Sequence, residues 1–375
     1  MTLDQVEYNV LDRAKQAFIE AARRTLTFAE DFGFVPDTKL GASANIFSLN
    51  LAPYIRSGAE NLYITLLPEG LGTADDARPE DLSKSEQYEF WYNIATKMMS
   101  ALTNDAAASG LQTILLGLYL PSSSPEIVFN EEFLKGFLDG FVDGCRLVKC
   151  VYFSGETPQL KNKIVTDKLD IAGALFGLMP AGLSPISSNA IKAGDKIVFI
   201  ESSGPHENGF TALRELASRL PHGYRTTLPS GEEYWRAINR GSKLYTPYVQ
   251  TLLKAGIKPT NIENITGHGW QKLMRSAKPY RYVINKMLPV PEVFSFIEEH
   301  SNTPPSRMVE IFNYGAGLAV YLPDQASAEK AVELAKTVNL NGVIAGEIEE
   351  AKDREVVIEP LNTTLHGKDF ILQKS

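Results

Sequence analysis

Residues 196–213 have the sequence KIVFIESSGPHENGFTAL, and the rest of the chain is organised around this stretch. The apolar run Ile197–Ile200 contains β-branched residues and predicts a short buried strand. The run breaks at Ser202-Ser203-Gly204-Pro205, because glycine frees the backbone and proline removes a hydrogen-bond donor. Apolar residues then recur at helical spacing, which predicts a helix that begins near Asn208.

The turn therefore lies at the amino end of a predicted helix. Free backbone N–H groups and the helix dipole attract anions at such an end. Two serine hydroxyls, His206 and Asn208 beside it suit a ligand that carries phosphate. The same pattern also fits an ordinary strand–turn–helix with good capping, and spacing alone leaves both interpretations open.

Residues 202–209, SSGPHENG, resemble the SSGPHSNG signature of aminoimidazole ribonucleotide synthase, also called phosphoribosylformylglycinamidine cyclo-ligase. Other segments of the second half are similar to elements of this family in the same order. They are LYTPYV at 244–249, ITGHG at 265–269 (family ITGGG), PEVF at 291–294 and FNYGAG at 312–317. The resemblance extends from about Asn61 to about Leu334.

The first half departs from the family pattern. Residues 41–47, GASANIF, stand where the family carries a richer glycine loop, and only Gly41 remains. Residues 68–74, PEGLGTA, are similar to TDGVGTK, with Glu69 as the carboxylate and Ala74 in place of the lysine. Arg78, one helical turn later, is the candidate replacement for the missing positive charge.

Three acidic residues match the positions at which the family holds magnesium. Glu69 follows a predicted strand, Asp105 lies in TNDA at the end of a predicted helix, and Glu156 lies in SGET, similar to the family's GGET. Mg²⁺ uses one or two protein carboxylates and otherwise phosphate oxygens and water. The resemblance therefore implies a cage for Mg²⁺ and ATP, whereas each acid alone also fits an exposed turn residue.

Composition sets limits on the class of protein. The chain has 375 residues, 44% of them apolar, and a net charge of −8. It is long enough for about two domains, and its charge argues against a general nucleic-acid surface. The two cysteines, Cys145 and Cys150, do not make a disulfide framework, and no segment is apolar enough for a membrane span. We expect a cytoplasmic protein with no nucleic-acid or membrane partner.

Apolar periodicity predicts the elements of an α+β protein. The predicted helices cover 10–30, 84–109 and 131–144, and the predicted strands cover 62–67, 111–120, 147–153, 171–178 and 197–200. We place a domain boundary near Asp167, which gives an ATP/Mg-binding and dimerisation domain, 1–167, and a domain with the substrate loops, 168–375. Residues 221–241 are treated as an insertion without functional signal, and 361–375 as a polar extension.

The resemblance implies a homodimer with a two-domain fold, in which mixed and antiparallel sheets are flanked by helices and the N-terminal sheets pair into a barrel. The implied reaction is ATP-dependent ring closure of formylglycinamidine ribonucleotide in purine synthesis. ATP phosphorylates the formyl amide oxygen, an amidine nitrogen attacks, and phosphate leaves. The implied catalytic residues are His206 and Asn208; those for ATP and metal are Gly41, Glu69, Gly72, Thr73, Asn104, Asp105, Gly155, Glu156 and Thr157; those for substrate are Ser202, Ser203, Gly204, Gly209, Thr266, Gly267, His268 and Gly269.

Two other functions stay open on the sequence. One is a related enzyme of the same superfamily that uses ATP on a different small substrate, as a kinase or synthetase. The other is a ligand-binding or scaffold paralogue that has lost catalysis. The nearly intact SSGPHENG and PEVF segments favour the cyclo-ligase, whereas Ala74 and the missing glycine loop favour the alternatives.

Overall fold

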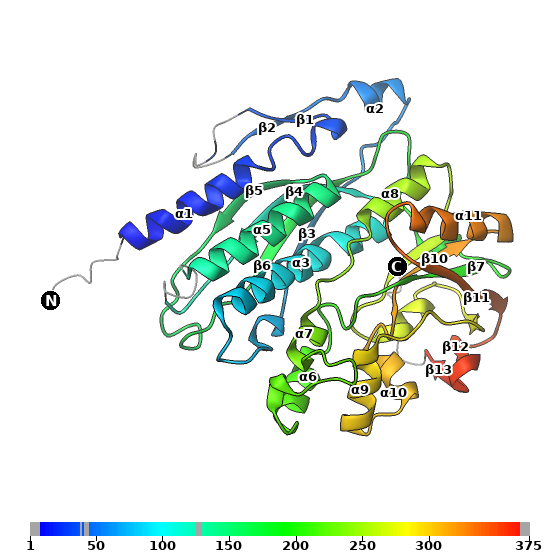
Figure 1. The fold of residues 1–375 in the computed structure, drawn as a ribbon. Coiled ribbons are helices and arrows are strands. Elements are labelled where there is room, and N and C mark those ends of the chain that lie inside the picture. Colours follow the sequence, from blue (N-terminus) through cyan, green and yellow to red (C-terminus); the bar gives the residue numbers. More distant parts are fainter. Residues whose placement is uncertain (1–7, 38–39, 41–44, 125–129, 368–375) are drawn as a thin grey trace. The chain divides into compact units, whose positions relative to one another are not determined.

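The computed structural model describes residues 8–37, 40, 45–124 and 130–367. The predicted α+β class is confirmed, with mixed and antiparallel sheets flanked by helices (Figure 1). The chain divides into two compact units, one made of 1–106 with 111–183 and the other of 107–110 with 184–375. Among the described residues, no helix is both long and apolar enough to cross a membrane.

The first unit contains a four-stranded sheet in the order β3-β6-β4-β5 and a two-stranded hairpin, β1-β2. Its strands are β1 (Phe34–Pro36), β2 (Phe47–Leu49), β3 (Ile64–Gly70), β4 (Gln112–Tyr119), β5 (Val151–Glu156) and β6 (Ala172–Leu178). Its helices include α1 (Tyr8–Arg23), α2 (Ala52–Arg56), α3 (Lys84–Ala108) and α5 (Glu131–Val148), with short 3₁₀ turns at Glu30–Phe32 and Ala74–Asp76.

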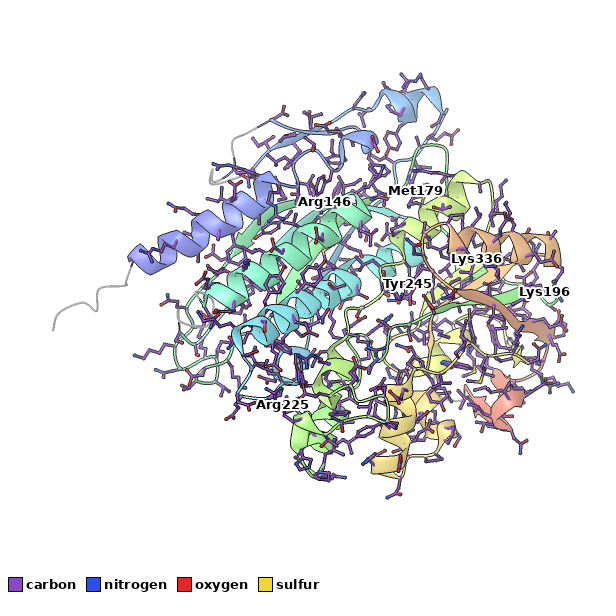
Figure 2. All side chains as sticks on the ribbon, viewed as in Figure 1. Arg146, Met179, Lys196, Arg225, Tyr245 and Lys336 are labelled. Atoms are coloured by element: carbon purple, nitrogen blue, oxygen red, sulfur yellow. The ribbon has the colours of Figure 1, made fainter. Side chains whose placement is uncertain are left out.

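Helices α3 and α5 pack unusually closely in the first unit. A Cβ added at Gly136 or at Gly140 would lie 2.5 Å from the carbonyl oxygen of Tyr88 or of Tyr92. Glycine at these two positions, one helical turn apart, therefore lets the backbone of α5 come close to the backbone of α3. Leu102 of α3 in turn reaches Gly173 of β6, where an added Cβ would lie 3.2 Å from the leucine Cδ1. The helices thus cover one face of the sheet, and their side chains fill the space above it (Figure 2).

The second unit contains a seven-stranded sheet in the order β13-β12-β9-β11-β7-β10-β8. All neighbours are antiparallel except β9 and β12. Its strands are β7 (Lys196–Glu201), β8 (Asn261–Asn264), β9 (Tyr280–Ile284), β10 (Ala316–Leu322), β11 (Gly342–Glu350), β12 (Glu355–Ile358) and β13 (Thr363–His366). Its helices are α6 (Phe210–Ala217), α7 (Tyr234–Asn239), α8 (Thr246–Lys254), α9 (Glu292–Ser301), α10 (Pro305–Ile311) and α11 (Gln325–Lys336), with 3₁₀ turns at Ser188–Ala190, Gly223–Arg225, Gly269–Met274 and Glu359–Leu361.

Strand β7 is buried on both faces, as its continuous apolar run predicts. Val198 and Ile200 belong to a core with Tyr248 of α8 and Ala331 of α11. Phe199 points to the opposite face, where its ring lies 4.9 Å from that of Trp270. Since successive side chains of a strand point to opposite faces, this packing fixes the register with which β7 enters the 202–209 turn.

Several predicted boundaries are corrected by the structure. Helix α1 ends at Arg23, not at residue 30, because Thr25 accepts a hydrogen bond from the Tyr152 N–H at 2.9 Å and so joins β5. Helix α5 continues to Val148, and Lys149 ends it with a left-handed φ of 61°, so the next strand begins at Val151 and not at 147. Residues 363–366 form β13, which pairs with β12, so the segment from 361 is not a plain polar extension.

The strand expected to open the second domain lies in the first unit. β6 pairs with β3 and with β4, both antiparallel, so it is a central strand of the first sheet. The compact units consequently change at residues 183 and 184, one strand after the predicted boundary at 167. The functional roles assigned to the two domains stay a prediction.

Candidate functional site

The 202–209 turn extends from the end of β7, between the neighbouring strands β10 and β11. Ser202 is buried, and its backbone N–H donates to the carbonyl oxygen of Gly315 at 3.0 Å. Ser203 is half-buried, and its hydroxyl donates to the carbonyl oxygen of Gly241 at 2.6 Å. The predicted turn therefore contacts two other segments that lie far from it in the sequence.

Asn313 connects three segments of the site. Its Oδ1 accepts from the Ser202 hydroxyl at 2.7 Å and from the Gly315 N–H at 3.2 Å, while its Nδ2 donates to the Gly204 carbonyl oxygen at 2.9 Å. The indole N–H of Trp270 donates to the Asn313 carbonyl oxygen at 2.8 Å. The sequence analysis gave the segment 312–317 as similar to a family element but assigned no role to Asn313, although an asparagine inside a glycine-rich turn is itself a signal for such contacts.

His206 is almost completely buried and has a left-handed φ of 56°. Its Nε2 accepts from the backbone N–H groups of Ser203 at 3.2 Å and Lys243 at 3.4 Å. A ring nitrogen that accepts two N–H groups carries no proton, so this geometry assigns the neutral tautomer with the proton on Nδ1. The contacts give His206 a role in holding the turn, and its predicted catalytic role stays a prediction.

Asn208 and Gly209 complete the turn. Gly209 has a φ of 77°, and an added Cβ would lie 2.2 Å from the ring of Phe312, so only glycine fits there. The buried Nδ2 of Asn208 has no hydrogen-bond partner, and its Oδ1 lies 3.6 Å from the Cβ position of Gly267. The predicted SSGPHENG and ITGHG turns are therefore neighbours, and Asn208 supplies an unused donor beside them.

The second glycine turn, 266–269, also depends on close packing. An added Cβ at Gly269 would lie 2.1 Å from the Val309 carbonyl oxygen. His268 is exposed and has a left-handed φ of 70°, so it stands at the tip of the turn. Behind the turn, the buried ammonium of Lys272 donates to the Asn264 carbonyl oxygen at 3.2 Å and to the Thr266 hydroxyl. Nothing in the spacing pointed to Lys272.

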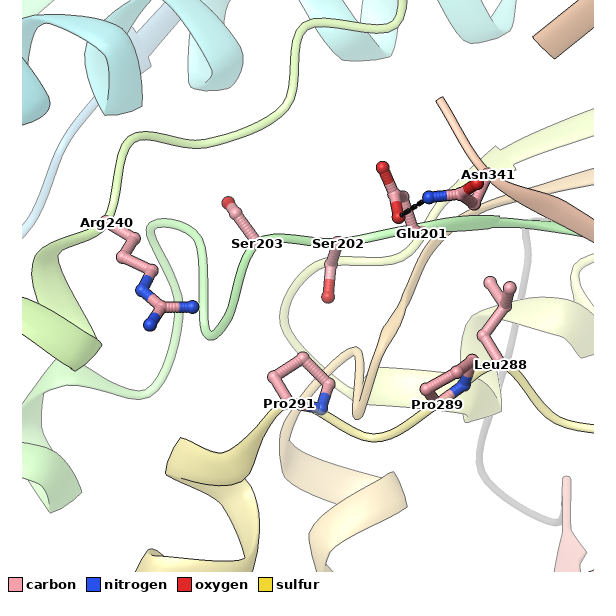
Figure 3. Close-up of a pocket in the computed structure, with 8 residues that line it drawn as sticks. All are labelled: Glu201, Ser202, Ser203, Arg240, Leu288, Pro289, Pro291 and Asn341. Atoms are coloured by element: carbon pink, nitrogen blue, oxygen red, sulfur yellow. Dashed lines mark hydrogen bonds between the residues drawn. The ribbon is translucent and has the colours of Figure 1, made fainter. Parts of the chain in front are cut away.

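A pocket of about 270 Å³ opens at the start of the 202–209 turn (Figure 3). It contains both predicted substrate serines, and its wall also includes residues that sequence reasoning did not connect with them. The lining residues are Glu201, Ser202, Ser203, Arg240, Leu288, Pro289, Pro291 and Asn341. The predicted substrate loop therefore borders a real cavity.

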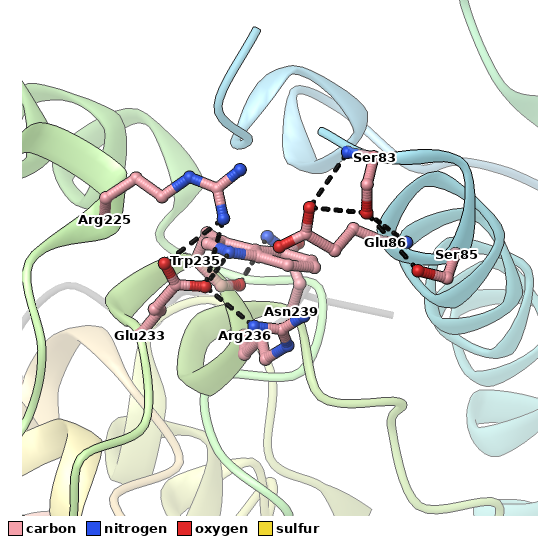
Figure 4. A network of polar contacts seen from close by, with 8 residues as sticks. All are labelled: Ser83, Ser85, Glu86, Arg225, Glu233, Trp235, Arg236 and Asn239. Atoms are coloured by element: carbon pink, nitrogen blue, oxygen red, sulfur yellow. Dashed lines mark hydrogen bonds and ion pairs between the residues drawn. The ribbon is translucent and has the colours of Figure 1, made fainter. Parts of the chain in front are cut away.

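Residues 221–241 are tightly organised by ion pairs (Figure 4). Glu233 accepts from Arg225 at 3.2 Å, from Arg236 at 2.7 Å and from the Trp235 indole N–H at 2.9 Å. Arg240, which follows α7, makes a two-pronged pair with Glu232. Residues 221–241, treated above as an insertion without functional signal, are thus held by arginine–glutamate pairs, and one of these arginines, Arg240, lines the pocket.

The three predicted metal ligands of the first unit lie on three elements, Glu69 on β3, Glu156 on β5 and Asp105 in α3. Cross-strand register places Glu69 opposite Gly173, Gly173 opposite Leu118, and Leu118 opposite Gly155, the neighbour of Glu156. Three strand spacings separate the backbones at Glu69 and Glu156 by about 14 Å. In the part of the chain that the structure describes, no three His, Cys, Asp or Glu side chains are grouped so that they could hold a metal ion. Glu69, Asp105 and Glu156 therefore do not fit one shared Mg²⁺ site.

Arg78, the candidate replacement for the missing lysine, is half-buried against aromatic rings, and its role stays a prediction. Its guanidinium stacks on Trp91 and on Phe90, 4.4 and 4.9 Å from the ring centroids. Ala74 is fully buried, and the next residue, Asp75, is buried as well. Burial raises the pKa of the Asp75 carboxyl to about 7, and the charge of neighbouring Asp76 contributes to the rise. The segment that follows the predicted ATP element thus turns its charged groups into the protein.

The other predicted nucleotide residues lie in different settings. Gly72 and Thr73 are exposed, Gly155 is exposed, and Thr157 is half-buried. Asn104 is fully buried inside α3, where its Nδ2 donates to the Ser100 hydroxyl at 2.8 Å. Gly41 lies outside the described residues. Their shared role in binding ATP stays a prediction.

Comparison with known proteins shows which proteins the chain is similar to. Residues 81–179 match the model of the family described as AIR synthase related protein, N-terminal domain. The chain is 23% identical over 325 residues to a phosphoribosylformylglycinamidine cyclo-ligase of Lawsonia intracellularis, covering 85% of this chain and 88% of that one. It is 25% identical over 324 residues to the enzyme of that name from Staphylococcus carnosus, covering 85% and 87%. The predicted family resemblance is confirmed.

Solved structures show the same fold in other proteins. The hydrogenase maturation protein HypE of E. coli has a TM-score of 0.60 at 15% identity, covering 95% of this chain and 96% of that one. Thiamine-monophosphate kinase from Stenotrophomonas maltophilia has a TM-score of 0.58 at 16% identity, covering 92% and 97%. At such identities these neighbours establish the fold and leave the reaction to be argued from the site.

Proposed function

We propose that this protein is an ATP-dependent cyclo-ligase that closes the ring of formylglycinamidine ribonucleotide to give aminoimidazole ribonucleotide. The support is twofold. Relatives that cover 85% of the chain carry the name of this enzyme. The second unit holds the family-like turns together around a pocket, through the contacts of Asn313 with Ser202 and Gly204. This interlocked set of loops is the observation that carries the proposal.

The proposed chemistry makes definite demands. ATP supplies the phosphoryl group that converts the formyl amide oxygen into a leaving group. The amidine nitrogen then attacks the same carbon, the C–O bond breaks, and phosphate leaves with the electron pair while the nitrogen loses a proton. A site for this reaction must hold the two nitrogen-bearing arms together and exclude water from the phosphorylated amide.

The residues of the second unit meet part of these demands. The unpartnered Nδ2 of Asn208 is a donor for the amide oxygen, and buried Ser202 fixes the turn that presents it. His206 holds the turn through its Nε2, and whether it also acts on the substrate is what its substitution tests. Since Glu69, Asp105 and Glu156 do not fit one metal ion, no step of the proposal is assigned to a metal.

ATP use and self-association belong to the same proposal. A fold neighbour, the hydrogenase maturation protein HypE, is known in complex with ATP. The edge strand β3 of the first unit exposes Ile64 and Leu66, with Leu66 three-quarters exposed, and Tyr119 of β4 is also exposed. Apolar side chains on an open sheet face and edge are typical of surfaces covered by a partner. A homodimer that joins these sheets is the arrangement we propose.

The decisive experiment follows phosphate release from ATP with formylglycinamidine ribonucleotide present or absent, and detects the aminoimidazole product. The proposal predicts one phosphate per ring closed and a loss of turnover in Asn208→Ala. His206→Ala is the informative companion: loss of turnover with unchanged substrate affinity would return a catalytic role to the imidazole. Phosphate release with a different acceptor would identify a related kinase or synthetase instead.

A second candidate function is a ligand-binding paralogue without phosphoryl transfer. The observation in its favour lies in the first unit, where Glu69 and Glu156 lie on opposite edge strands of the sheet, the lysine position is the buried Ala74, and Arg78 stacks on aromatic rings. Binding of the ribonucleotide without any ATP-dependent product would establish this alternative.

A further inference from the structure

The pocket at the end of β7 has two chemically different ends. Figure 3 shows Arg240 with its guanidinium directed toward the serine turn at one end, and Glu201 with Asn341 at the other. Leu288, Pro289 and Pro291 also line the pocket and supply its apolar surface. A pocket of about 270 Å³ is near the lower limit of about 300 Å³ for ligand sites, which suits a sugar phosphate or a part of a nucleotide.

The Arg240 end is already arranged to hold an anion. Its Nε donates to Glu232 Oε1 at 3.1 Å, and its Nη2 donates to Oε2 of the same carboxylate. Two parallel N–H···O bonds of this kind are also the geometry in which arginine binds phosphate. The pair is exposed enough to exchange, since 53% of the arginine side chain and 22% of the glutamate side chain are accessible.

The Glu201 end is acidic. Glu201 Oε2 accepts from Asn341 Nδ2 at 2.7 Å, and Oε1 lies 3.1 Å from Lys243 Nζ. A carboxylate held in place by an amide, with a partly exposed lysine as a counter-ion, is a receptor for a planar cationic group that offers N–H donors. An amidinium is such a group, whereas a neutral amide is a weaker partner for a carboxylate.

We propose that this pocket binds a ribose phosphate that also carries an amidinium: Arg240 exchanges Glu232 for the ligand's phosphate, and Glu201 binds the amidinium. The inference rests on the proposed function, because formylglycinamidine ribonucleotide carries both groups. The exchange at Arg240 is favourable because a phosphate monoester has about −1.5 to −2 charges near pH 7, against −1 for a carboxylate. The two charged ends then fix the direction in which the ligand lies.

The test uses titration calorimetry without ATP on three probes: the ribonucleotide, its nucleoside without phosphate, and the analogue in which an amide replaces the amidine. Charge-assisted hydrogen bonds contribute about 1.5–3 kcal/mol each, which corresponds to about 10- to 150-fold in affinity. Arg240→Gln should lower the affinity for the ribonucleotide at least about 10-fold and leave the affinity for the nucleoside within about twofold of the wild type's. Glu232→Gln should raise the affinity for the ribonucleotide, since the carboxylate that competes for Arg240 is removed.

Glu201→Gln tests the other end with the same probes. It should lower the affinity for the amidine ligand by about 10-fold and change the affinity for the amide analogue little, so that the protein no longer discriminates between the two ligands. The matched control is Arg225→Gln, which removes another arginine–glutamate pair outside the pocket lining, in which Nη1 of Arg225 donates to both carboxylate oxygens of Glu233. That control should bind all three probes as the wild type does.

The outcomes separate this inference from the proposed function. Equal weakening of ribonucleotide and nucleoside in Arg240→Gln, or no weakening of either, would overturn the phosphate assignment. Retained discrimination in Glu201→Gln would overturn the amidinium assignment. If the predicted binding pattern holds but no ring closure occurs with ATP, the pocket assignment stands and the cyclo-ligase proposal fails.

Discussion

The two units of this protein preserve the family pattern to different degrees. In the second, the turns at 202–209, 266–269 and 312–317 lie against one another, joined by Asn313 and by glycines that admit no Cβ. In the first, Glu69 and Glu156 lie on β3 and β5 at opposite edges of the sheet, Asp105 lies in α3, and Arg78 stacks on aromatic rings. The difference shows that segments matching a family in the same order can stand in different settings, as turns in mutual contact in one unit and on separate elements in the other.

The largest predicted effect concerns the buried carboxyl in the first unit. The folded pKa of Asp75 is about 7, raised from 3.8, so the folded state binds its proton more tightly than the unfolded state does. Stability must therefore fall as pH rises from about 4 to about 7, by up to about 4 kcal/mol. Asp75→Asn should remove this dependence and be more stable than the wild type at pH 8. Urea unfolding at a series of pH values measures it.

The control for that experiment is Asp353→Asn, which changes an exposed carboxylate in the second unit. It should leave the slope of stability against pH as in the wild type. An Asp75→Asn protein whose stability falls with pH as steeply as the wild type's would show that the carboxyl is not what carries the dependence.

The next largest effect is expected in the second unit, at Asn313. Asn313→Ala leaves the Ser202 hydroxyl, the Gly315 N–H and the Gly204 carbonyl oxygen without their partner. Buried groups that lose a partner cost about 1–3 kcal/mol each, so we expect about 3 kcal/mol of lost stability and loss of ribonucleotide binding. Denaturant unfolding and calorimetry measure the two effects. Exposed Asn189→Ala is the control, and equal behaviour of the two variants would refute the role of Asn313.

A smaller effect is expected at the sheet face of the first unit. Leu66→Asp places a charge on the most exposed large apolar side chain of β3. If this face joins two copies, the variant should sediment as a monomer at concentrations where the wild type is a dimer, with its unfolding otherwise little changed. Glu60→Asp, at an exposed acidic position before the strand, should leave association unchanged. A dimer that survives in Leu66→Asp argues for another interface.

The smallest effects are expected for the acids that do not form one site. Since Glu69 and Glu156 stand three strands apart, Glu69→Gln and Glu156→Gln should weaken Mg-ATP binding independently and only a few-fold each. Calorimetry of the single and double variants tests additivity. Complete loss of binding in either single variant would mean that ligand binding assembles the acids into one cage.

Sequence reasoning succeeded where the signal is local. The three-to-four spacing of apolar residues predicted α3, and the apolar run predicted β7. It failed where distant segments decide: Leu147 and Val148 resemble a strand start but end α5, and the place of β6 depends on pairing with β3 and β4.

The site divides in the same way. Gly209 and Ser202 were predicted because the turn and its serines are contiguous in the sequence. Arg240 and Asn313 were missed because each reaches the turn only through tertiary packing, more than thirty residues along the chain. The environment of His206 was equally hidden, since its acceptor role depends on the backbone of Lys243.

One measurement tests most directly the claim that the substrate site belongs to the second unit. It is the calorimetric affinity for formylglycinamidine ribonucleotide, without ATP, of the wild type and of the triple variant Glu69→Gln, Asp105→Asn, Glu156→Gln. Our account predicts the same affinity for both proteins, because the pocket and its turns lie entirely in residues 201–341. Loss of ribonucleotide binding in the triple variant, with its fold intact, would contradict it.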